Sequence, residues 1–390
     1  MYKRILKTDI LYTAKGSPIT NGMLAIDETD RIIEVGQSIS SSEVDVEYFE
    51  GALCPGFINT HCHLELSYLK DKVPSQTGLP GFIQNLQSVR QADEDIIQAG
   101  IIDADLAMQK EGIVAVGDIS NGESSFQIKS TSPLYYHTFL ELFAFDPAQA
   151  VPALKRGQEL RSKAVNLVIA SSIVPHSPYS VSKKLFSLIS KLDDNQPLSI
   201  HNQETSSEND LYKNKSGKIM EMLDRFGLDT SRFELSGKSS LASYLEFLPK
   251  ESNLLLVHNT YTTDEDLEMA EINCRKLFWC FCPKANLYIE NRLPQINNFY
   301  DRNLRCTIGT DSLASNDKLS ILDELRVIQT HFPTIPLDVL IQWATINGAT
   351  FLGLNDSLGS FEVGKKAKVN WLKNVREEKL TNDSVVQPVN

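Results

Sequence analysis

The chain has 390 residues and a formal net charge of −12. This acidity argues against nucleic acid or an anionic membrane as a partner, because both are bound through clustered lysine and arginine. No apolar run is long enough to span a bilayer, and the N-terminus lacks the apolar core of a signal peptide, so we expect a cytoplasmic protein.

Short alternating apolar patterns separated by turns occupy the first fifty residues, at 5–14, 22–28 and 31–36. Closely spaced runs of this kind predict a small β-unit. A matching pattern returns near the C-terminus at 358–373. The polar residues 376–390 that follow are expected to be frayed or to form an edge strand.

Between these ends, β-branched or apolar runs alternate with longer helical patterns. We expect eight strands, at 52–61, 113–120, 133–142, 165–176, 198–204, 254–260, 276–283 and 305–312. Helical patterns separate most of them, for example at 93–112, 182–192, 216–227, 241–249 and 264–274, and two more follow at 319–332 and 337–353. Alternating strands and helices predict a parallel sheet of the α/β class, and eight such units predict a closed (β/α)8 TIM barrel.

Most histidines fall at the ends of these strands. Five of the seven do so, namely His61, His63, His176, His201 and His258, and Asp311 ends the eighth strand. In a (β/α)8 barrel the chemistry collects at the carboxyl ends of the strands, so these side chains should converge on one mouth. The remaining two are expected to be a core histidine, His137, and a residue at a helix end, His331.

The pair His61 and His63 suggests metal binding. Residues two apart on a strand project to the same face, which at the barrel mouth is the interior. With His201 and Asp311 they would offer nitrogen and oxygen donors suited to Zn²⁺ or Fe²⁺. Any one of these histidines could instead be a hydrogen-bonded structural residue, but the joint pattern over several strands favours a metal site.

Six cysteines are scattered along the chain and lie mostly in strand-like runs. Cys280 and Cys282 are too close along one strand to form a Cys-x-x-Cys metal site. We therefore expect free, buried cysteines in a reducing compartment.

Several motifs resemble those of the amidohydrolase superfamily, and together they cover nearly the whole chain. They are PGFINTHCHLE, HSPYS, HNQET, LVHNT, CPKANL, GTDSLASN, ATINGATFLGL and GSFEVGKKAKV. The resemblance implies a catalytic barrel over residues 55–354 and a small β-sandwich built from residues 1–54 and 355–390. One departure is Lys368, which stands where the closing motif of that family commonly has an acid.

Within the superfamily the chain looks like the deaminase and chlorohydrolase branch, and most like the aminofutalosine deaminases. That branch has His-x-x-Glu on its fifth strand, which His201 and Glu204 match. It lacks the carboxylated lysine that bridges two metals, and the fourth strand here ends in VPHSPYS without a lysine. The resemblance therefore implies one divalent metal ion, with Zn²⁺ favoured and Fe²⁺ as the alternative.

The resemblance also implies roles for these residues. The metal ligands would be His61, His63, His201 and Asp311. Asp311 would also take the proton of the attacking water, Glu204 would protonate the ring nitrogen, and His258 would orient the hydroxide. The alternative for Glu204 is an exposed loop acid, which would be favoured without the flanking His201, and the alternative for His258 is a core histidine.

Two further residues are candidate substrate contacts. His176 could hold a ribose or ring edge, and its alternative is a structural role. Glu65 lies on the same face as His63 if the strand continues, so it could pair with a substrate amine or hydroxyl, or it could cap the next turn. The polar connection at 67–81 could be a lid or a plain surface loop.

The leading hypothesis is a metal-dependent aminohydrolase that deaminates an aromatic ring, such as a 6-aminopurine nucleoside of the aminofutalosine kind, and releases ammonia. A rival enzyme would cleave another C–N or C–Cl bond, of the amide, guanine or triazine type. A rival from another class is a non-catalytic barrel that serves as a binding module. The expected partner is a small-molecule substrate, and because dimers are common in that family, a homodimer is the assembly to test.

Overall fold

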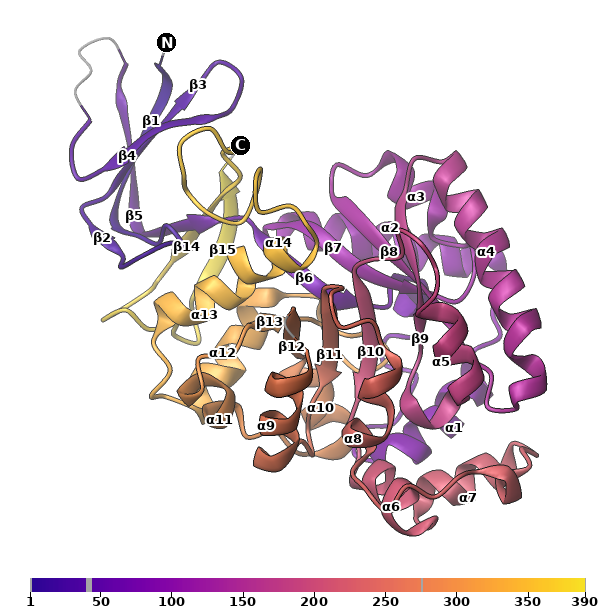
Figure 1. Ribbon diagram of the computed structural model, residues 1–390. Coiled ribbons are helices and arrows are strands. Elements are labelled where there is room, and N and C mark those ends of the chain that lie inside the picture. The colour runs from indigo at the N-terminus through magenta and orange to yellow at the C-terminus, as the bar shows by residue number, and fades with distance from the viewer. Residues whose placement is uncertain (1, 40–43, 275, 390) are drawn as a thin grey trace.

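Strands from both ends of the chain form one seven-stranded sheet in the computed structural model, which describes residues 2–39, 44–274 and 276–389 (Figure 1). The strands are β1 (Tyr2–Leu11), β2 (Ile19–Thr20), β3 (Met23–Asp27), β4 (Ile32–Gly36), β5 (Val46–Pro55), β14 (Val369–Lys373) and β15 (Val385–Val389). Their order is β15-β14-β5-β1-β3-β4, and β2 pairs with β1. The shared β-unit is therefore confirmed, and the last residues contain an edge strand.

The alternation read from the sequence follows the pleat of this sheet. Leu6 and Leu24, on paired strands, join one apolar cluster. Their neighbours Ile5 and Ala25 join another. Successive side chains on a strand point to opposite faces, so both faces of this sheet carry apolar residues.

The remaining eight strands form two four-stranded parallel sheets. The first runs in the order β6 (Phe57–Cys62), β7 (Ile113–Ser120), β8 (Tyr135–Leu142) and β9 (Ala170–Pro175). The second runs in the order β10 (Leu198–Asn202), β11 (Leu254–His258), β12 (Leu277–Phe281) and β13 (Cys306–Ile308). Spatial order equals chain order in both sheets, as strand–helix alternation predicts.

Hydrogen bonds also join the outer strands of these two sheets. Just beyond β9, the carbonyl oxygen of His176 accepts the amide of His201 in β10 at 3.0 Å. At the other side, the carbonyl oxygen of His61 in β6 accepts the amide of Thr310 at 3.0 Å, and Asp311 forms an isolated parallel bridge with Cys62. The carboxyl ends of β6, β9, β10 and β13 are therefore held together.

Helices surround these strands (Figure 1). The α-helices are α1 (Gly78–Val89), α2 (Glu94–Lys110), α3 (Phe126–Thr131), α4 (Ala150–Asn166), α5 (Lys183–Ile189), α6 (Ser206–Asn214), α7 (Lys218–Arg225), α8 (Ser240–Tyr244), α9 (Asp264–Asn273), α10 (Pro283–Glu290), α11 (Ile296–Asp301), α12 (Ile321–His331), α13 (Leu337–Ala344) and α14 (Ile346–Phe351). The 3₁₀ helices are η1 (Leu64–Leu69), η2 (Pro147–Gln149), η3 (Pro178–Ser180), η4 (Thr230–Arg232) and η5 (Leu245–Phe247). Helix α2 shows why these segments are helical: it buries Ile101, Ala104 and Met108, which share one face at helical spacing.

Several expected boundaries differ from the structure, and three of them have a clear local cause. The expected strand at 52–61 is two strands, because β5 ends at Pro55 and β6 begins at Phe57. The expected strand at 165–176 begins only at Ala170, since its first residues end α4; Val165 is apolar but exposed, which imitates a strand in the sequence. The helical pattern at 337–353 is two helices that break at Thr345.

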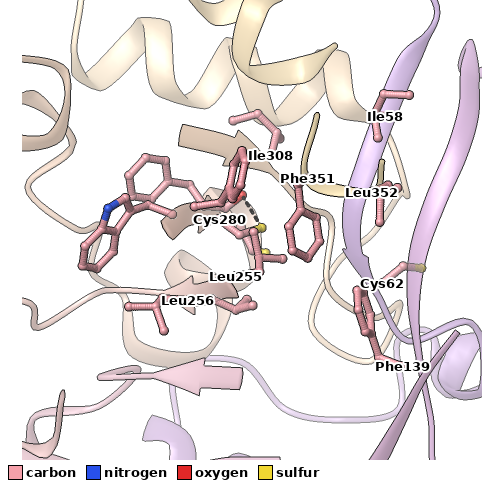
Figure 2. Close-up of a cluster of buried hydrophobic side chains, with 14 of the residues drawn as sticks. Ile58, Cys62, Phe139, Leu255, Leu256, Cys280, Ile308, Phe351 and Leu352 are labelled. Carbon is pink, nitrogen blue, oxygen red and sulfur yellow. Dashed lines mark hydrogen bonds between the residues drawn. The ribbon is translucent and has the colours of Figure 1, made fainter. Parts of the chain in front are cut away.

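The main core lies between the parallel strands and the helices that pack on them. Figure 2 shows part of it, where Ile58 and Cys62 of β6 lie near Leu352 and Phe351. All six cysteines are free and buried, as expected. No helix within the described ranges is long and apolar enough to cross a membrane.

Gly309, between β13 and Asp311, has no space for a side chain. A Cβ there would lie 2.8 Å from the His61 Cβ and 2.9 Å from the sulfur atoms of Cys280 and Cys282. Because overpacking a tight core typically costs ~1–3 kcal/mol, Gly309→Ala should lower the free energy of unfolding by about that amount, measured by denaturant titration. Gly122→Ala is the matched control, since a Cβ at Gly122 meets nothing within 4 Å. Equal stability of the two variants would contradict the close packing behind His61.

Candidate metal centre and catalytic site

The sequence-predicted residues gather at the carboxyl ends of the parallel strands. The last residue of β10 is Asn202, which follows His201, and the last residue of β11 is His258. The others lie at or just beyond their strands: His61 in β6, His63 after β6, His176 after β9 and Asp311 after β13. Side chains separated by up to 250 residues (61 to 311) thus share one region, as the strand ends predicted.

His61, His63 and Asp311 converge on one point. The Oδ1 atom of Asp311 lies 3.5 Å from Nε2 of His61 and 3.4 Å from Nε2 of His63. The other carboxylate oxygen accepts a hydrogen bond from the Ser315 hydroxyl at 2.5 Å, which fixes the orientation of the carboxylate. All three ligand atoms lie close enough together to hold one metal ion.

His201 and His258 complete the cluster of imidazoles around His61. The ring of His61 lies 4.9 Å from that of His201 and 5.7 Å from that of His258, centroid to centroid. His61, His201 and His258 form a second group of three whose ligand atoms could hold a metal. The two groups share His61, which lies at the centre of the cluster.

The hydrogen bonds of His201 indicate which ring nitrogen is available. Its Nδ1 lies 2.9 Å from the carbonyl oxygen of His176. A carbonyl oxygen can only accept, so this contact requires the proton on Nδ1 and leaves the lone pair on Nε2. This is the tautomer that a metal-binding histidine needs when its other nitrogen is held by an acceptor.

The donor set fits a divalent metal ion. His61 is fully buried, and neither of its ring nitrogens has a hydrogen-bond partner among the described residues. Burial, followed by the neighbouring His201, lowers the pKa of His61 far below its ordinary value and so favours the neutral imidazole. Buried neutral imidazoles beside a carboxylate are the ligands that zinc and iron sites use, and such orphaned nitrogens would otherwise be costly.

Glu204 is buried beside this cluster and is not an exposed loop acid. Its Oε1 lies 3.6 Å from Nε2 of His258. Burial is the main cause that raises the pKa of Glu204 well above its ordinary value, and the charge of Asp311 adds to it. The turn that carries Glu204 is held by Glu208, whose carboxylate accepts the amide of Gln203 at 2.9 Å.

The backbone at two of these positions is strained. His258 has φ 75° and Asp311 has φ 55°, a region that non-glycine residues seldom adopt. After His258, Asn259 holds the turn: its side-chain amide donates to the carbonyl oxygens of Leu256 at 2.9 Å and Cys280 at 3.1 Å. Strain of this kind clusters at functional sites, where the surrounding structure over-determines it.

Glu65 lies in a 3₁₀ helix and not on a continuation of the strand that carries His61. The strand does not continue past His63, because β6 ends at Cys62 and Glu65 lies in η1. Its carboxylate accepts the amide of Asn121 at 3.1 Å and lies 3.5 Å from the guanidinium of Arg90. The condition for a shared face with His63 is therefore not met, since the chain turns into a 3₁₀ helix directly after His63.

His176 lies between the cluster and a cavity of about 470 Å³. Its ring is 4.7 Å from that of His201 and 4.3 Å from that of Phe143. The cavity is lined mostly by apolar and aromatic side chains, among them Phe143, Tyr179 and Met222. A partly exposed imidazole that faces such a cavity can contact a bound molecule.

The other two histidines are as expected. His137 is buried within β8 and pairs with the Ser172 hydroxyl at 3.0 Å. His331 ends α12.

Sequence reasoning missed Glu141, a buried carboxylate near the end of β8. Its Oε1 lies 2.7 Å from Nδ1 of His176 and 3.4 Å from Nδ1 of His201, and its Oε2 accepts the side-chain amide of Asn121 at 2.9 Å. The sequence contained an indication of this residue. An acid near the carboxyl end of an apolar strand is expected at the same ends of the parallel strands as the histidines.

Comparisons with known proteins give a family match over most of the chain. A sequence model described as the amidohydrolase family matches residues 52–387. An adenosine deaminase of Helicobacter pylori is 29% identical over 87% of this chain and 85% of its own length.

Two solved structures share the fold. The aminofutalosine deaminase of Helicobacter pylori, in complex with methylthio-coformycin, has a TM-score of 0.79 and 24% identity over 97% of this chain and 94% of that one. The atrazine chlorohydrolase of Arthrobacter aurescens TC1, complexed with zinc, has a TM-score of 0.74 and 16% identity over 97% of this chain and 89% of that one.

Proposed function

This chain belongs to the amidohydrolase family, and on that premise we propose that it is a metal-dependent aminohydrolase that removes the exocyclic amino group of a purine nucleoside as ammonia. The observation that carries the proposal is the convergence of His61, His63 and Asp311 on one point, with Glu204 and His258 beside them. This combines a metal-ligand set with a buried carboxyl that can transfer protons.

The proposed metal ligands are His61, His63, His201 and Asp311. When bound, a divalent ion would act as a Lewis acid that makes hydroxide available near neutral pH. We propose one ion per chain, because residues 170–176 contain no lysine that could bridge a second. Zinc is favoured by the ligand set and by the zinc-bound relative, and iron remains the alternative.

The chain's own residues would move the protons of the reaction. Asp311 accepts the proton of the attacking water at its carboxylate. Glu204 donates a proton to the ring nitrogen beside the reacting carbon, and then takes up the proton of the newly formed hydroxyl group and passes it to the departing nitrogen. The proton held by Asp311 returns to Glu204 at the end of the cycle. The water oxygen bonds to the carbon, the C–N bond breaks, and ammonia leaves. His258 orients the attacking oxygen and stabilises the negative charge that develops on it.

The proposed substrate class is a 6-aminopurine nucleoside, with aminofutalosine as one member. Support comes from two relatives, one named for adenosine and one for aminofutalosine. His176 is the proposed substrate contact, because it adjoins the apolar cavity. A direct contact of Glu65 with substrate stays a prediction.

A second candidate activity is hydrolysis of a C–Cl or another C–N bond on the same scaffold. The similarity to an atrazine chlorohydrolase supports it. The same ligands and the same activated water would serve both reactions, so the leaving group would depend on the shape of the pocket. A non-catalytic binding module is disfavoured by the complete set of donors together with Glu204.

A screen for ammonia release tests the proposal. Purified zinc-loaded protein would be incubated with adenosine, 5′-deoxyadenosine, aminofutalosine, guanine and cytosine. We expect release from at least one 6-aminopurine nucleoside. Release from none of these compounds would overturn the proposal and favour the amide or halide alternative.

We also propose a closed (β/α)8 barrel over residues 55–354 and a small β-sandwich from residues 1–54 and 355–390. The hydrogen bonds between β9 and β10 and between β6 and the chain after β13 support closure. The apolar residues on both faces of the terminal sheet support the sandwich. A cytoplasmic location and a homodimer stay predictions.

A further inference from the structure

We propose that Glu141 is a positioning residue: it holds the imidazoles of His176 and His201, and so sets the geometry of the metal centre and of the substrate contact at once. The inference rests on the proposed function and assigns a role to a residue that the catalytic scheme does not use. Its basis is the position of the buried Glu141 carboxylate, where the carboxyl ends of β8, β9 and β10 meet.

The first step is the contact with the two histidines. One oxygen of Glu141, Oε1, lies 2.7 Å from Nδ1 of His176 and 3.4 Å from Nδ1 of His201. The Glu141 side chain is almost fully buried, with 2% of its surface exposed. The contacts with the two imidazoles are ion-pair contacts, and no hydrogen bond is formed at Oε1 within the described ranges. The negative charge of the carboxylate favours the tautomers in which both Nδ1 atoms carry the proton.

The second step is the consequence for His201. The carbonyl oxygen of His176 accepts from the same Nδ1 at 2.9 Å, so a backbone acceptor and a carboxylate act together on one N–H. The lone pair of His201 is then on Nε2, toward the cluster that includes His61. Carboxylate–histidine–metal arrangements of this kind orient the ring and raise the basicity of the ligand.

The third step is the anchoring of the carboxylate itself. Its second oxygen, Oε2, accepts the side-chain amide of Asn121 at 2.9 Å. The backbone amide of Asn121 in turn donates to Glu65 at 3.1 Å. The short helix after His63 is thereby tied, through Glu65 and Asn121, to the same carboxylate that holds His201.

Glutamine cannot replace this carboxylate. Glu141 offers one oxygen to the imidazoles and one to the Asn121 amide, whereas glutamine has a single acceptor oxygen. Whichever way its amide turns, an NH₂ group faces a donor. Glu141→Gln therefore removes the positioning while keeping the size of the side chain.

The test measures the affinity of the apo-protein for Zn²⁺ by competition with a chromogenic chelator. Because loss of an outer partner of a metal ligand typically costs about 10–100-fold in affinity, Glu141→Gln should weaken Zn²⁺ binding by that factor. It should also raise KM, since His176 loses the carboxylate charge that lies 2.7 Å from its Nδ1. Glu141→Asp, which keeps the carboxylate on a shorter side chain, should recover part of the affinity, and it decides the question if Glu141→Gln does not fold.

Asp105→Asn is the matched control. Asp105 is a buried carboxylate of α2 that accepts from the Tyr136 hydroxyl at 2.6 Å and the Ser132 hydroxyl at 2.7 Å, near the start of β8. It should bind Zn²⁺ as the wild type does. Wild-type affinity in Glu141→Gln, or an equal loss in Asp105→Asn, would overturn the positioning role.

Failure of the inference can be told from failure of the proposed function. If the wild type binds Zn²⁺ and releases ammonia while Glu141→Gln matches it in both affinity and KM, only the inference is wrong. If the wild type binds Zn²⁺ but releases no ammonia in the screen, the proposed function is wrong, and the ratio of the two Zn²⁺ affinities still decides the role of Glu141.

Discussion

Glu204→Gln is expected to abolish ammonia release while leaving the metal in place. The amide keeps the size of the side chain but cannot donate an acidic proton to the ring nitrogen or carry one to the leaving ammonia. Because general acid–base catalysis contributes roughly 10²–10⁴-fold, we expect kcat to fall by about that factor or more. The measurement is steady-state ammonia release, with metal content determined on the same sample.

The position of Glu204 explains why the metal should remain. Its Oε1 lies 3.6 Å from His258, and the two groups of donors that could hold a metal near it, around His61, do not include it. Glu324→Gln is a suitable control, because that carboxyl is equally buried and burial raises its pKa to about 8. Glu324 accepts hydrogen bonds from the Asn316 side chain at 2.8 Å and from the Lys284 amide at 2.9 Å. Its replacement by glutamine should therefore lower the stability of the fold more than it lowers kcat. Wild-type kcat in Glu204→Gln would remove Glu204 from the proton transfers.

The site residues that could be predicted from the sequence are those whose placement follows from strand geometry alone. His201 and His258 fall at the carboxyl ends of their strands, and parallel strands bring such ends together. The same reasoning predicted that Asp311 would join them, although it lies beyond β13 and reaches the site through a bridge to Cys62. The ends of the strands could be read from the local sequence pattern. The parallel pairing of the strands then brings these ends together, although they are far apart in the sequence.

The positions of other side chains could not be predicted, because they depend on the residue at which a strand ends. A shared face for Glu65 and His63 required the strand to continue past His63, but the chain turns into η1 at Leu64. The amide of Leu64 donates to the buried carboxylate of Asp118 at 2.7 Å. That hydrogen bond joins residues 54 apart in sequence, so it cannot be predicted from a periodic pattern of apolar residues.

Glu141 was missed for a related reason. Its proposed role depends on contacts with His176, which follows β9, and His201, which lies in β10. A single acid within an apolar run carries no spacing motif, in contrast to His-x-His. The same holds for the terminal sheet: alternation predicted β1, β3, β4 and β14, whereas β5 was not predicted as a strand of this sheet, and its pairing with both β1 and β14 depends on tertiary packing.

Removal of the metal is expected to abolish turnover and to lower thermal stability. The two ring nitrogens of His61, which have no hydrogen-bond partner among the described residues, would be left buried without the ion. An ion that binds only the folded chain, present at 100 times its Kd, stabilises that chain by about 2.7 kcal/mol. Chelated protein should therefore unfold at a lower temperature than zinc-loaded protein, and added Zn²⁺ should restore both stability and ammonia release.

The Asp311→Asn variant tests whether Asp311 binds the metal directly or is only a polar residue near it. The amide keeps the shape but loses the charge that faces His61 and His63 and removes one of the two oxygens, so Zn²⁺ affinity should fall by more than the ~10–100-fold typical of an outer contact. Asp105→Asn serves again as the control.

Metal analysis of the wild type should give about one ion per chain, because the four proposed ligands surround a single position with one site left open for water. Two ions per chain would contradict the mononuclear site and would direct attention to Glu141, His176 and His201, the remaining group of donors around His201 that could hold a metal.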